Sequence, residues 1–236
     1  MKSTLFASLL ICALLTVSCS KQETVFERYN LETGAWILHQ IDGQPVEENN
    51  LFIYHFEDGR FAFASRVEDG LGGNTWETTP SVLYDFDGTD ARLFYASGPM
   101  DLTVKNLDYA SLICDCQWLH QTFSFYHAPM DYSQAIMGIW QGRNTTPNTE
   151  YPETARWGFY PNGRYTYSQL LDDGTWSEPQ SNGYALYGDL LVCIFKITPT
   201  SENRCEVWKI ATNNGVDMTW TAIRDGAPNS VQMSKL

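Results

Sequence analysis

Apolar and polar residues alternate with a period of two over most of the chain, and turn residues interrupt the alternation every eight to twelve positions. This pattern, with many β-branched and aromatic residues, is typical of antiparallel barrels and sandwiches. Asp58-Gly59 and Asn162-Gly163 supply the positive φ angles that tight hairpins require. We expect hairpins of 52–56 with 60–63 and of 157–160 with 164–167, and further strands at 81–86, 91–96, 101–107, 110–117, 182–187, 189–197, 204–211 and 216–224.

The chain also contains an internal repeat. Gly34-Ala35-Trp36 recurs as Gly138-Ile139-Trp140 at an offset of 104, and the same offset relates residues 59–63 to 163–167. Two motifs at one offset indicate a duplicated unit, and closing each unit into a barrel removes exposed sheet edges. The repeat predicts two modules of about eight strands each. Their boundaries are 34–127 and 136–225, with a linker at 128–135 and a C-terminal tail at 226–236.

The first 18 residues have the pattern of a secretory signal peptide. A positive start is followed by an apolar run of 13 residues, Leu5 to Val17, which is too short for a stable membrane span. The junction from Leu15 to Cys19 resembles a bacterial lipobox. The resemblance implies that residues 1–18 are removed, that Cys19 is acylated, and that 19–33 form a tether. Several acyl chains bury enough methylenes to hold a protein on a membrane.

The polar residues after this cysteine, Lys21-Gln22-Glu23, resemble the tether of outer-membrane or surface lipoproteins in Bacteroidetes-type bacteria. The resemblance implies a soluble body that is exported beyond the cytoplasm and held at the outer membrane or cell surface through its lipid. A plain signal peptide that is cleaved nearby, with Cys19 incidental, is the alternative interpretation.

Three motifs together resemble the lipocalin-like, or calycin-like, domains of Bacteroidetes lipoproteins. They are the GxW sequence at the start of each module, a hairpin of the form Phe-x-x-Gly-Arg-aromatic, and the segment Tyr184 to Leu191. The resemblance implies an all-β fold with two small antiparallel barrels in tandem. It also implies that a tryptophan closes each barrel floor, that a glycine lets the strand approach closely, and that an arginine of the last strand stacks on the indole. These floor residues are Gly34, Trp36, Gly138, Trp140 and Arg224, and the first module has no matching arginine near its end.

A lipocalin-like cup implies binding of a small hydrophobic or amphiphilic ligand between aromatic side chains. The candidate lining residues are Phe61, Phe63, Tyr165 and Tyr167. An eight-stranded barrel is only just wide enough to be filled by its own side chains. The alternative for either module is therefore an interior that its own side chains fill, with no ligand pocket. In that case the protein is a non-enzymatic surface interaction module for a glycan or a partner protein, with the barrels as its scaffold.

Four cysteines remain after Cys12 and Cys19 are set aside, and pairing is the default in an exported protein. If strands 189–197 and 204–211 form a hairpin centred near Pro199, Cys193 and Cys205 face each other at disulfide distance. We therefore expect a disulfide between these two residues.

Cys114 and Cys116 point to one face of their strand, because side chains two residues apart share a face. With His120 and His127 downstream, they offer the residue types of a Cys2His2 zinc site. The spacing matches no common zinc finger, so we favour two packed thiols or a local disulfide and expect no metal.

Charge and motif content exclude several function classes. A formal net charge of −13 and the lack of clustered Lys and Arg oppose nucleic-acid binding. The sequence contains no GxSxG, HExxH, P-loop or Rossmann motif. We therefore expect neither an enzyme nor a cofactor, and the expected partners are a membrane, through the lipid anchor, and a small apolar or amphiphilic ligand or a glycan.

Overall fold

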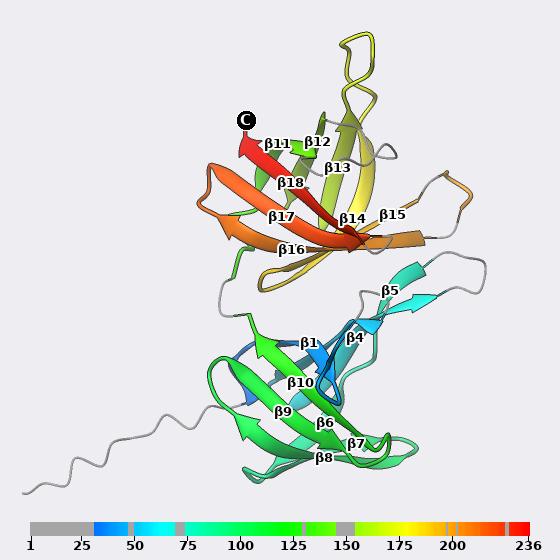
Figure 1. Ribbon diagram of the computed structural model, residues 1–236. Coiled ribbons are helices and arrows are strands. Elements are labelled where there is room, and N and C mark those ends of the chain that lie inside the picture. Colours follow the sequence, from blue (N-terminus) through cyan, green and yellow to red (C-terminus); the bar gives the residue numbers. More distant parts are fainter. Residues whose placement is uncertain are drawn as a thin grey trace, which may run out of the picture.

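The computed structural model describes residues 31–46, 50–68, 74–128, 131–144, 154–196, 198–201, 203–224 and 227–236. The signal peptide and Cys19 lie outside these residues. The described part is all-β apart from short 3-10 turns, among them η1 (Leu31–Thr33), and has two antiparallel sheets (Figure 1). No helix in this part is long and apolar enough to cross a bilayer.

The first sheet closes into a barrel of eight strands, because β1 pairs with both β3 and β10. The short β2 pairs with β1, and β5 pairs with β4, and both lie outside the closed ring. The strands of this part are β1 (Ala35–Ile41), β2 (Gln44–Pro45), β3 (Phe52–Glu57), β4 (Arg60–Glu68), β5 (Asn74–Thr78), β6 (Val82–Phe86), β7 (Asp90–Tyr95), β8 (Gly98–Leu107), β9 (Ser111–Cys116) and β10 (Gln121–His127). We call this unit barrel 1.

The second sheet is a closed barrel of eight strands in chain order, and we call it barrel 2. Its strands are β11 (Gly138–Asn144), β12 (Thr154–Tyr160), β13 (Arg164–Gln169), β14 (Gln180–Tyr187), β15 (Leu190–Lys196), β16 (Asn203–Asn213), β17 (Asp217–Arg224) and β18 (Ala227–Lys235). The two sheets are separate, which confirms the prediction of two tandem antiparallel barrels of about eight strands each.

The prediction of a C-terminal tail at 226–236 is wrong. Residues 227–235 form β18, which pairs with β17 and β11 and thereby closes barrel 2. Val231 and Met233 of this strand are buried among the apolar residues inside the barrel. The alternation rests on few apolar residues in a segment rich in Ser, Asn and Gln, so the local pattern is weak, and the strand is required by closure of the sheet.

The two floors have the same construction, as the repeat predicts. Trp36 and Trp140 are both fully buried, and their indole N–H groups donate to the backbone oxygens of Leu31 at 2.8 Å and Ile136 at 2.7 Å. Leu31 belongs to the segment expected as a tether, but it is fully buried in the floor of barrel 1 because it packs with this core.

Gly34 and Gly138 precede these tryptophans by two residues and have φ angles of +143° and +117°. A Cβ added at Gly34 would lie 2.8 Å from Nε2 of His127, and one at Gly138 would lie 2.7 Å from Cε of Lys235. Glycine is required at both positions, because of the backbone conformation and because the last strand passes so closely.

The cation expected over Trp140 comes from a different residue. Arg224 pairs with Ala227 next to the β17–β18 turn, whereas Trp140 pairs with Lys235 at the other end of β18. The Nζ atom of Lys235 lies 5.3 Å from the centroid of the Trp140 ring. The prediction for Arg224 is wrong because β18, and not β17, is the last strand of barrel 2.

Barrel 1 has a corresponding residue on its own last strand, although it lacks the arginine. The ring of His127 lies 5.0 Å from that of Trp36. Its two ring nitrogens lie 2.9 Å from the backbone oxygen of Thr33 and 3.0 Å from that of Tyr109. In both barrels, therefore, a basic residue of the last strand covers the floor tryptophan.

The expected disulfide between Cys193 and Cys205 does not form. Cys193 pairs with Glu206, and Cys205 pairs with Ile194, so the two cysteines are one residue out of register. A shift of one residue places side chains on opposite faces of a sheet. Cys193 is buried inside barrel 2, while Cys205 is buried on its outer face against barrel 1.

An apolar junction joins the two barrels. Outward-facing side chains of barrel 1, including Ile37 and Ile53, form one buried cluster with Leu190, Val192 and Val207 of barrel 2. Figure 1 shows β5 reaching from barrel 1 toward β15 and β16. The segment expected as a linker, 128–135, also takes part in packing, since Ala128 belongs to this cluster.

Polar contacts across the junction add to the apolar ones. The Trp76 indole N–H donates to the Tyr187 hydroxyl at 3.1 Å, and the backbone N–H of Cys205 donates to the Asn74 side chain at 3.0 Å. The Tyr126 hydroxyl donates to Asp189 at 3.4 Å. Burial raises the pKa of this aspartate, although Lys209 lies nearby. The space between the two barrels is therefore occupied by packed side chains at these positions.

Candidate functional site

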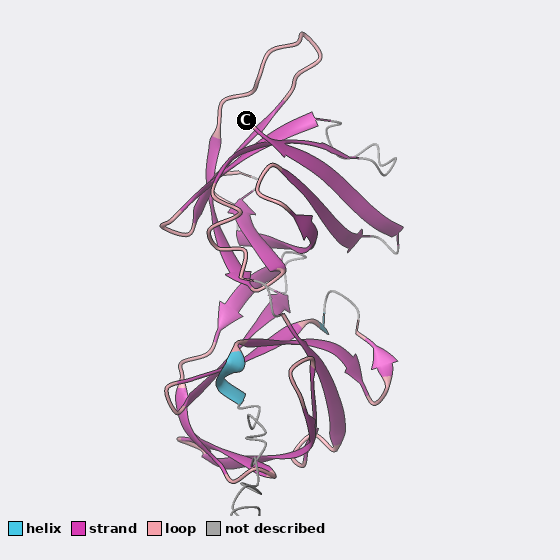
Figure 2. Ribbon diagram, turned by 90° about the vertical axis from the view of Figure 1, so that its left-hand side faces the viewer, coloured by secondary structure: helices cyan, strands magenta, loops and turns pink. Residues whose placement is uncertain are grey.

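Barrel 1 has a closed end and an open end. Its closed end holds Trp36, η1 and the turns at 58–59, 87–89 and 108–110, whereas the turns at 96–97 and 117–120 lie at the other end. Glu32 of η1 accepts hydrogen bonds from the Gly59 backbone at 2.7 Å and from the Tyr84 hydroxyl at 2.9 Å. These bonds lower the pKa of Glu32. Figure 2 shows the short helix against barrel 1, which it helps to close.

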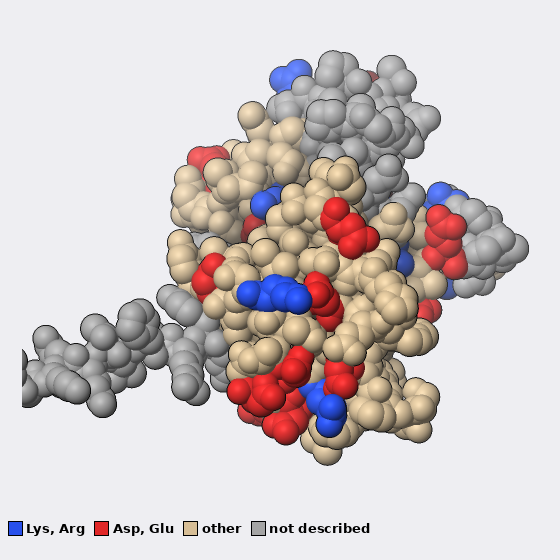
Figure 3. All heavy atoms as spheres, turned by 60° about the horizontal axis from the view of Figure 1, so that its bottom comes forward, with Lys and Arg blue, Asp and Glu red and all other residues tan. Residues whose placement is uncertain are grey.

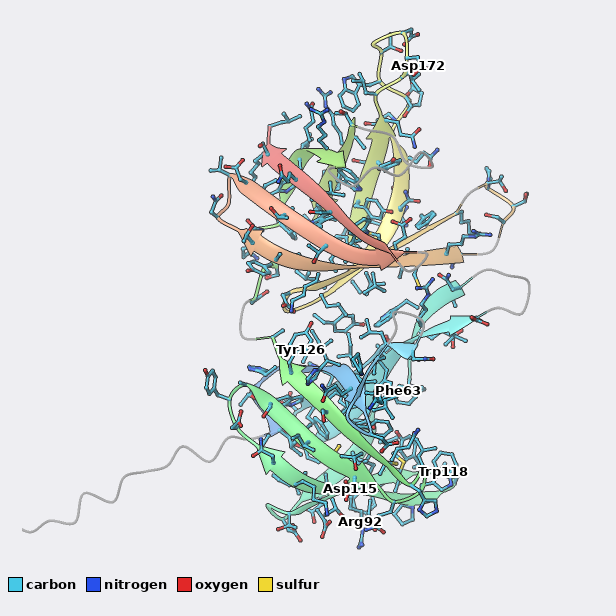
Figure 4. All side chains as sticks on the ribbon, viewed as in Figure 1. Phe63, Arg92, Asp115, Trp118, Tyr126 and Asp172 are labelled. Carbon is cyan, nitrogen blue, oxygen red and sulfur yellow. The ribbon has the colours of Figure 1, made fainter. Side chains whose placement is uncertain are left out.

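A cavity of about 720 Å³ lies inside barrel 1 toward the open end. Its wall is mainly apolar, seven of the fifteen lining residues are aromatic, and several of these rings contact one another. Tyr54 lies 5.0 Å from Phe61, and Phe52 lies 5.3 Å from Phe123, measured between ring centroids. The cavity is lined by Phe52, Tyr54, Phe61, Phe63, Tyr95, Ser97, Gly98, Pro99, Met100, Asp101, Cys116, Gln117, Trp118, Leu119 and Phe123. Phe63 and Trp118 are labelled in Figure 4.

The structure places the four predicted lining residues in two different environments. Phe61 and Phe63 belong to the wall of the barrel 1 cavity. Tyr165 is buried in barrel 2, where its ring stacks on Phe159 at 5.8 Å. Tyr167 packs 5.5 Å from Trp157 in the same interior. The structure therefore brings the first pair to a cavity and the second pair into a packed aromatic cluster.

The polar groups of the cavity are few, and sequence analysis did not single out two of them. The Tyr54 side chain is deeply buried, Tyr95 is half-buried, and both line the cavity with the Cys116 thiol. Burial raises the pKa of both tyrosines, that of Tyr54 strongly, so both stay protonated at neutral pH. Tyr54 lies on the same strand face as Phe52, and Tyr95 lies on the same face as Leu93. This period-two pattern was the available signal, but it does not distinguish a cavity wall from a core.

The cysteines and histidines of the first module are not brought together. Cys114 and Cys116 both point into barrel 1, which confirms that they share a face. Burial raises the pKa of the Cys114 thiol to about 12. His120 lies in the β9–β10 turn at the open end, whereas His127 lies at the floor. These four side chains therefore do not form a common ligand set.

Exposed apolar residues lie at the rim of the cavity, and an acidic surface covers the outer wall of barrel 1 beside it. Trp118 is 75% exposed and Leu119 is 48% exposed in the β9–β10 turn. On the outer face beside them, Arg92 donates to Asp101 at 2.7 Å and 3.2 Å, which lowers the pKa of this aspartate. Asp85, Asp87 and Asp90 lie around the same shallow hollow. Figure 3 shows acidic side chains gathered around few basic ones on this side of the molecule.

The interior of barrel 2 is filled mainly by tryptophan. Trp157, Trp208 and Phe159 lie 5.4 to 5.8 Å from Trp220, measured between ring centroids. The indole N–H of Trp220 is buried and has no hydrogen-bond acceptor among the described residues. These contacts describe a packed aromatic cluster among the described residues of barrel 2.

Comparison with known proteins gives little further information. No protein-family model matches the chain, and no curated protein matches its sequence. Structural matches include two mutant forms of the vaccine antigen transferrin binding protein B from Haemophilus parasuis Hp5, each 8% identical to this chain. The matches cover 78% and 79% of this chain, but only 53% and 60% of those chains, with TM-scores of 0.25 and 0.22. Such low scores support no conclusion about relationship or function, so the site is interpreted from its own geometry.

Proposed function

We propose that this protein binds a small hydrophobic or amphiphilic ligand in the cavity of barrel 1 and catalyses no reaction. The observation that carries the proposal is the cavity of about 720 Å³ with its aromatic wall. This volume lies within the usual range for small-molecule pockets, which are mostly apolar with a few polar groups. Barrel 2, with its packed aromatic cluster, serves in this proposal as a rigid support.

The proposed place of action is a membrane surface outside the cytoplasm, at the outer membrane or the cell surface. The support comes from the sequence alone, in the lipobox-like junction that ends at Cys19 and in its resemblance to Bacteroidetes-type lipoproteins. Cys19→Ser would remove the acylated residue. We expect the variant to leave the membrane fraction or to remain unprocessed, and unchanged membrane fractionation would contradict the anchor.

Ligand binding is tested by filling the cavity. Met100→Trp places an indole in the cavity wall, while Leu83→Trp adds the same group on the outer face of barrel 1, where Leu83 is 57% exposed. We expect the apolar fluorescent probe 1-aminoanthracene to bind the wild type and Leu83→Trp alike, and Met100→Trp at least tenfold more weakly. Equal binding by all three folded proteins, or by none, would contradict a ligand site in barrel 1.

A surface interaction module is the second candidate function, and the exposed Trp118 favours it. An exposed indole is suited to stacking on a sugar ring or to anchoring a protein contact. Trp118→Ala would then abolish binding to a glycan array or partner, whereas Met100→Trp, inside the barrel, would leave that surface binding nearly intact. Loss of probe binding without loss of any surface interaction would favour the cavity instead.

A further inference from the structure

The cavity of barrel 1 lacks a partner for a negative charge. Asp101 is the only charged residue among the described residues that line it. Arg92 lies beside Asp101, and its guanidinium already donates one hydrogen bond to each carboxylate oxygen of this aspartate. An anionic group entering the cavity would lose its hydration without gaining a counter-charge, which strongly disfavours binding. The net charge of the chain, −13, acts in the same direction.

The cavity does offer a hydrogen-bond donor. Tyr54 is 6% exposed and lines the cavity, and burial raises the pKa of its phenol, so the hydroxyl there is a neutral donor. Buried hydroxyl groups are normally hydrogen-bonded, so a phenol in a cavity wall is suited to donate to a polar atom of a ligand or to a water molecule. Its ring is fixed by contacts with Phe61 at 5.0 Å and Phe125 at 4.5 Å, so the hydroxyl is held in place rather than free to turn toward solvent.

We infer that the cavity selects uncharged ring compounds that carry a hydrogen-bond-accepting oxygen, such as a carbonyl, at their buried end, and that Tyr54 donates to this oxygen. The inference rests on the proposed ligand-binding function and specifies its ligand class. The aromatic wall contacts the ring system, since aromatic side chains stack or meet edge to face. The phenol fixes the orientation of the ligand in the same way that isolated polar groups do in other apolar pockets.

Three probes that share a dimethylaminonaphthalene ring test both parts of the inference. One carries a propionyl ketone, one carries no substituent at that position, and one carries a carboxylate. We expect the ketone to bind most tightly and the carboxylate at least tenfold more weakly at pH 7.4, as measured by fluorescence titration of the full chain. A carboxylate that binds as tightly as the ketone would overturn the selection against anions.

Two tyrosine variants isolate the hydrogen bond. Tyr54→Phe should weaken the ketone roughly two- to tenfold, the range for loss of one neutral hydrogen bond, and leave the unsubstituted probe unchanged. The control, Tyr109→Phe, removes a hydroxyl from a residue that is 63% exposed in a turn at the closed end and should change neither probe. Thermal unfolding verifies that both variants fold. An equal loss for both probes in Tyr54→Phe would overturn the hydrogen bond.

A gain of binding provides an independent measure of the charge argument. Gln117→Arg places a cation at the cavity rim, where Gln117 is exposed. We expect at least threefold tighter binding of the carboxylate probe and little change for the ketone, and no change for the carboxylate would count against the charge argument. If the wild type binds none of the three probes, the proposed ligand-binding function fails. If it binds all three equally, the cavity binds ligands and only the selectivity inferred here fails.

Discussion

Trp36 in barrel 1 and Trp140 in barrel 2 make equivalent contacts at the floors of their barrels, but the barrel interiors beyond the floors differ. Each tryptophan is buried, donates to a backbone oxygen a few residues earlier, and lies beneath a basic residue of the last strand. In barrel 2, Trp157, Trp208 and Trp220 pack together in the interior, whereas Trp36 is the only tryptophan among the described core residues of barrel 1. The rings that line the cavity of barrel 1 are mostly the smaller ones of Phe and Tyr.

This difference separates what the duplicated fold needs from what each copy does. Both barrels need a sealed floor, because it fixes the first strand against the last. The open end of a barrel is not required for closure, so its interior can be packed or hollow. The following predictions test where the two copies are equivalent and where they are not.

The largest effect is expected at the floors. Trp36→Ala and Trp140→Ala should each destabilise their barrel by about 3 to 5 kcal/mol, the usual loss for a buried Trp or Phe. Urea unfolding followed by circular dichroism and by the remaining tryptophans gives the two values. Because the floors share their construction, we expect the losses to agree within about 1 kcal/mol. A neutral effect in either barrel would show that the floors are not equivalent.

The next effect concerns Trp76 and Trp176, each of which follows a threonine and comes after the second strand of the repeated hairpin, β4 or β13. Trp76 is buried in the junction and bonded to Tyr187, whereas Trp176 is half-exposed with the Arg156 guanidinium 3.8 Å from its ring centroid. We expect Trp76→Ala to cost about 3 kcal/mol and Trp176→Ala about 1 kcal/mol.

Calorimetry should also distinguish these two variants by the number of transitions. Loss of Trp76 weakens the contact between the barrels, so their melting transitions should separate, while Trp176→Ala should leave the coupling intact. A single unchanged transition in Trp76→Ala would contradict a stabilising junction.

A smaller effect is expected from the cation above Trp140. Lys235→Met keeps much of the side-chain volume but removes the charge, and it should cost about 0.5 to 1 kcal/mol, the usual size of a partly exposed cation–π contact. Thermal unfolding measures the loss, and Lys196→Met, in an exposed position at the end of β15, is the control. If the two variants are equally stable, the contact with Trp140 contributes nothing measurable.

The smallest effect distinguishes two equivalent turns by pH. Asp108 in barrel 1 accepts from the backbone N–H groups of Ala110 and Ser111, and Asn214 in barrel 2 accepts from those of Val216 and Asp217. Hydrogen bonds from Asn106 and from the backbone lower the pKa of Asp108 from 3.8 to about 2.

Because the folded-state pKa of Asp108 is lowered, its stabilising contribution is present above the ordinary pKa of 3.8 and is lost as the pH falls toward 2. We expect an NMR titration of its carboxyl carbon to have a midpoint near pH 2, and Asp108→Asn to reduce the acid sensitivity of the β8–β9 turn. The turn at Asn214 has a side-chain amide in place of the Asp108 carboxyl group and serves as the internal comparison. A midpoint near 3.8 would contradict these hydrogen bonds.

Local patterns predicted much of the fold. The GxW repeat identified both floors, and period-two alternation located most strands, because these features depend on residues close together in the chain. Alternation also placed Cys114 and Cys116 on one face. Closure is a long-range property, and for that reason β18 and its Lys235 were missed while Arg224 was assigned in its place.

The errors at Cys193 and Cys205 have a more specific cause. Lys196 pairs with Asn203, so the centre of the β15–β16 hairpin lies half a residue beyond Pro199. That small displacement places the two thiols on opposite faces, and no local pattern determines it. Local sequence patterns also do not predict which barrel contains the cavity. Phe61 and Tyr165 follow the same hairpin motif, and only the rings contributed by distant strands decide which one faces a cavity.

The position of η1 has a consequence for how the proposed lipoprotein faces its surroundings. The described chain begins at Leu31, on the sealed side of barrel 1, while Trp118 lies on the opposite side. The stretch from Cys19 to Leu31 reaches at most about 40 Å when fully extended. If acyl groups on Cys19 fix the chain to a bilayer, the tether joins barrel 1 at its sealed side, and the cavity entrance lies at the end away from this attachment. The tether then leaves the entrance unobstructed.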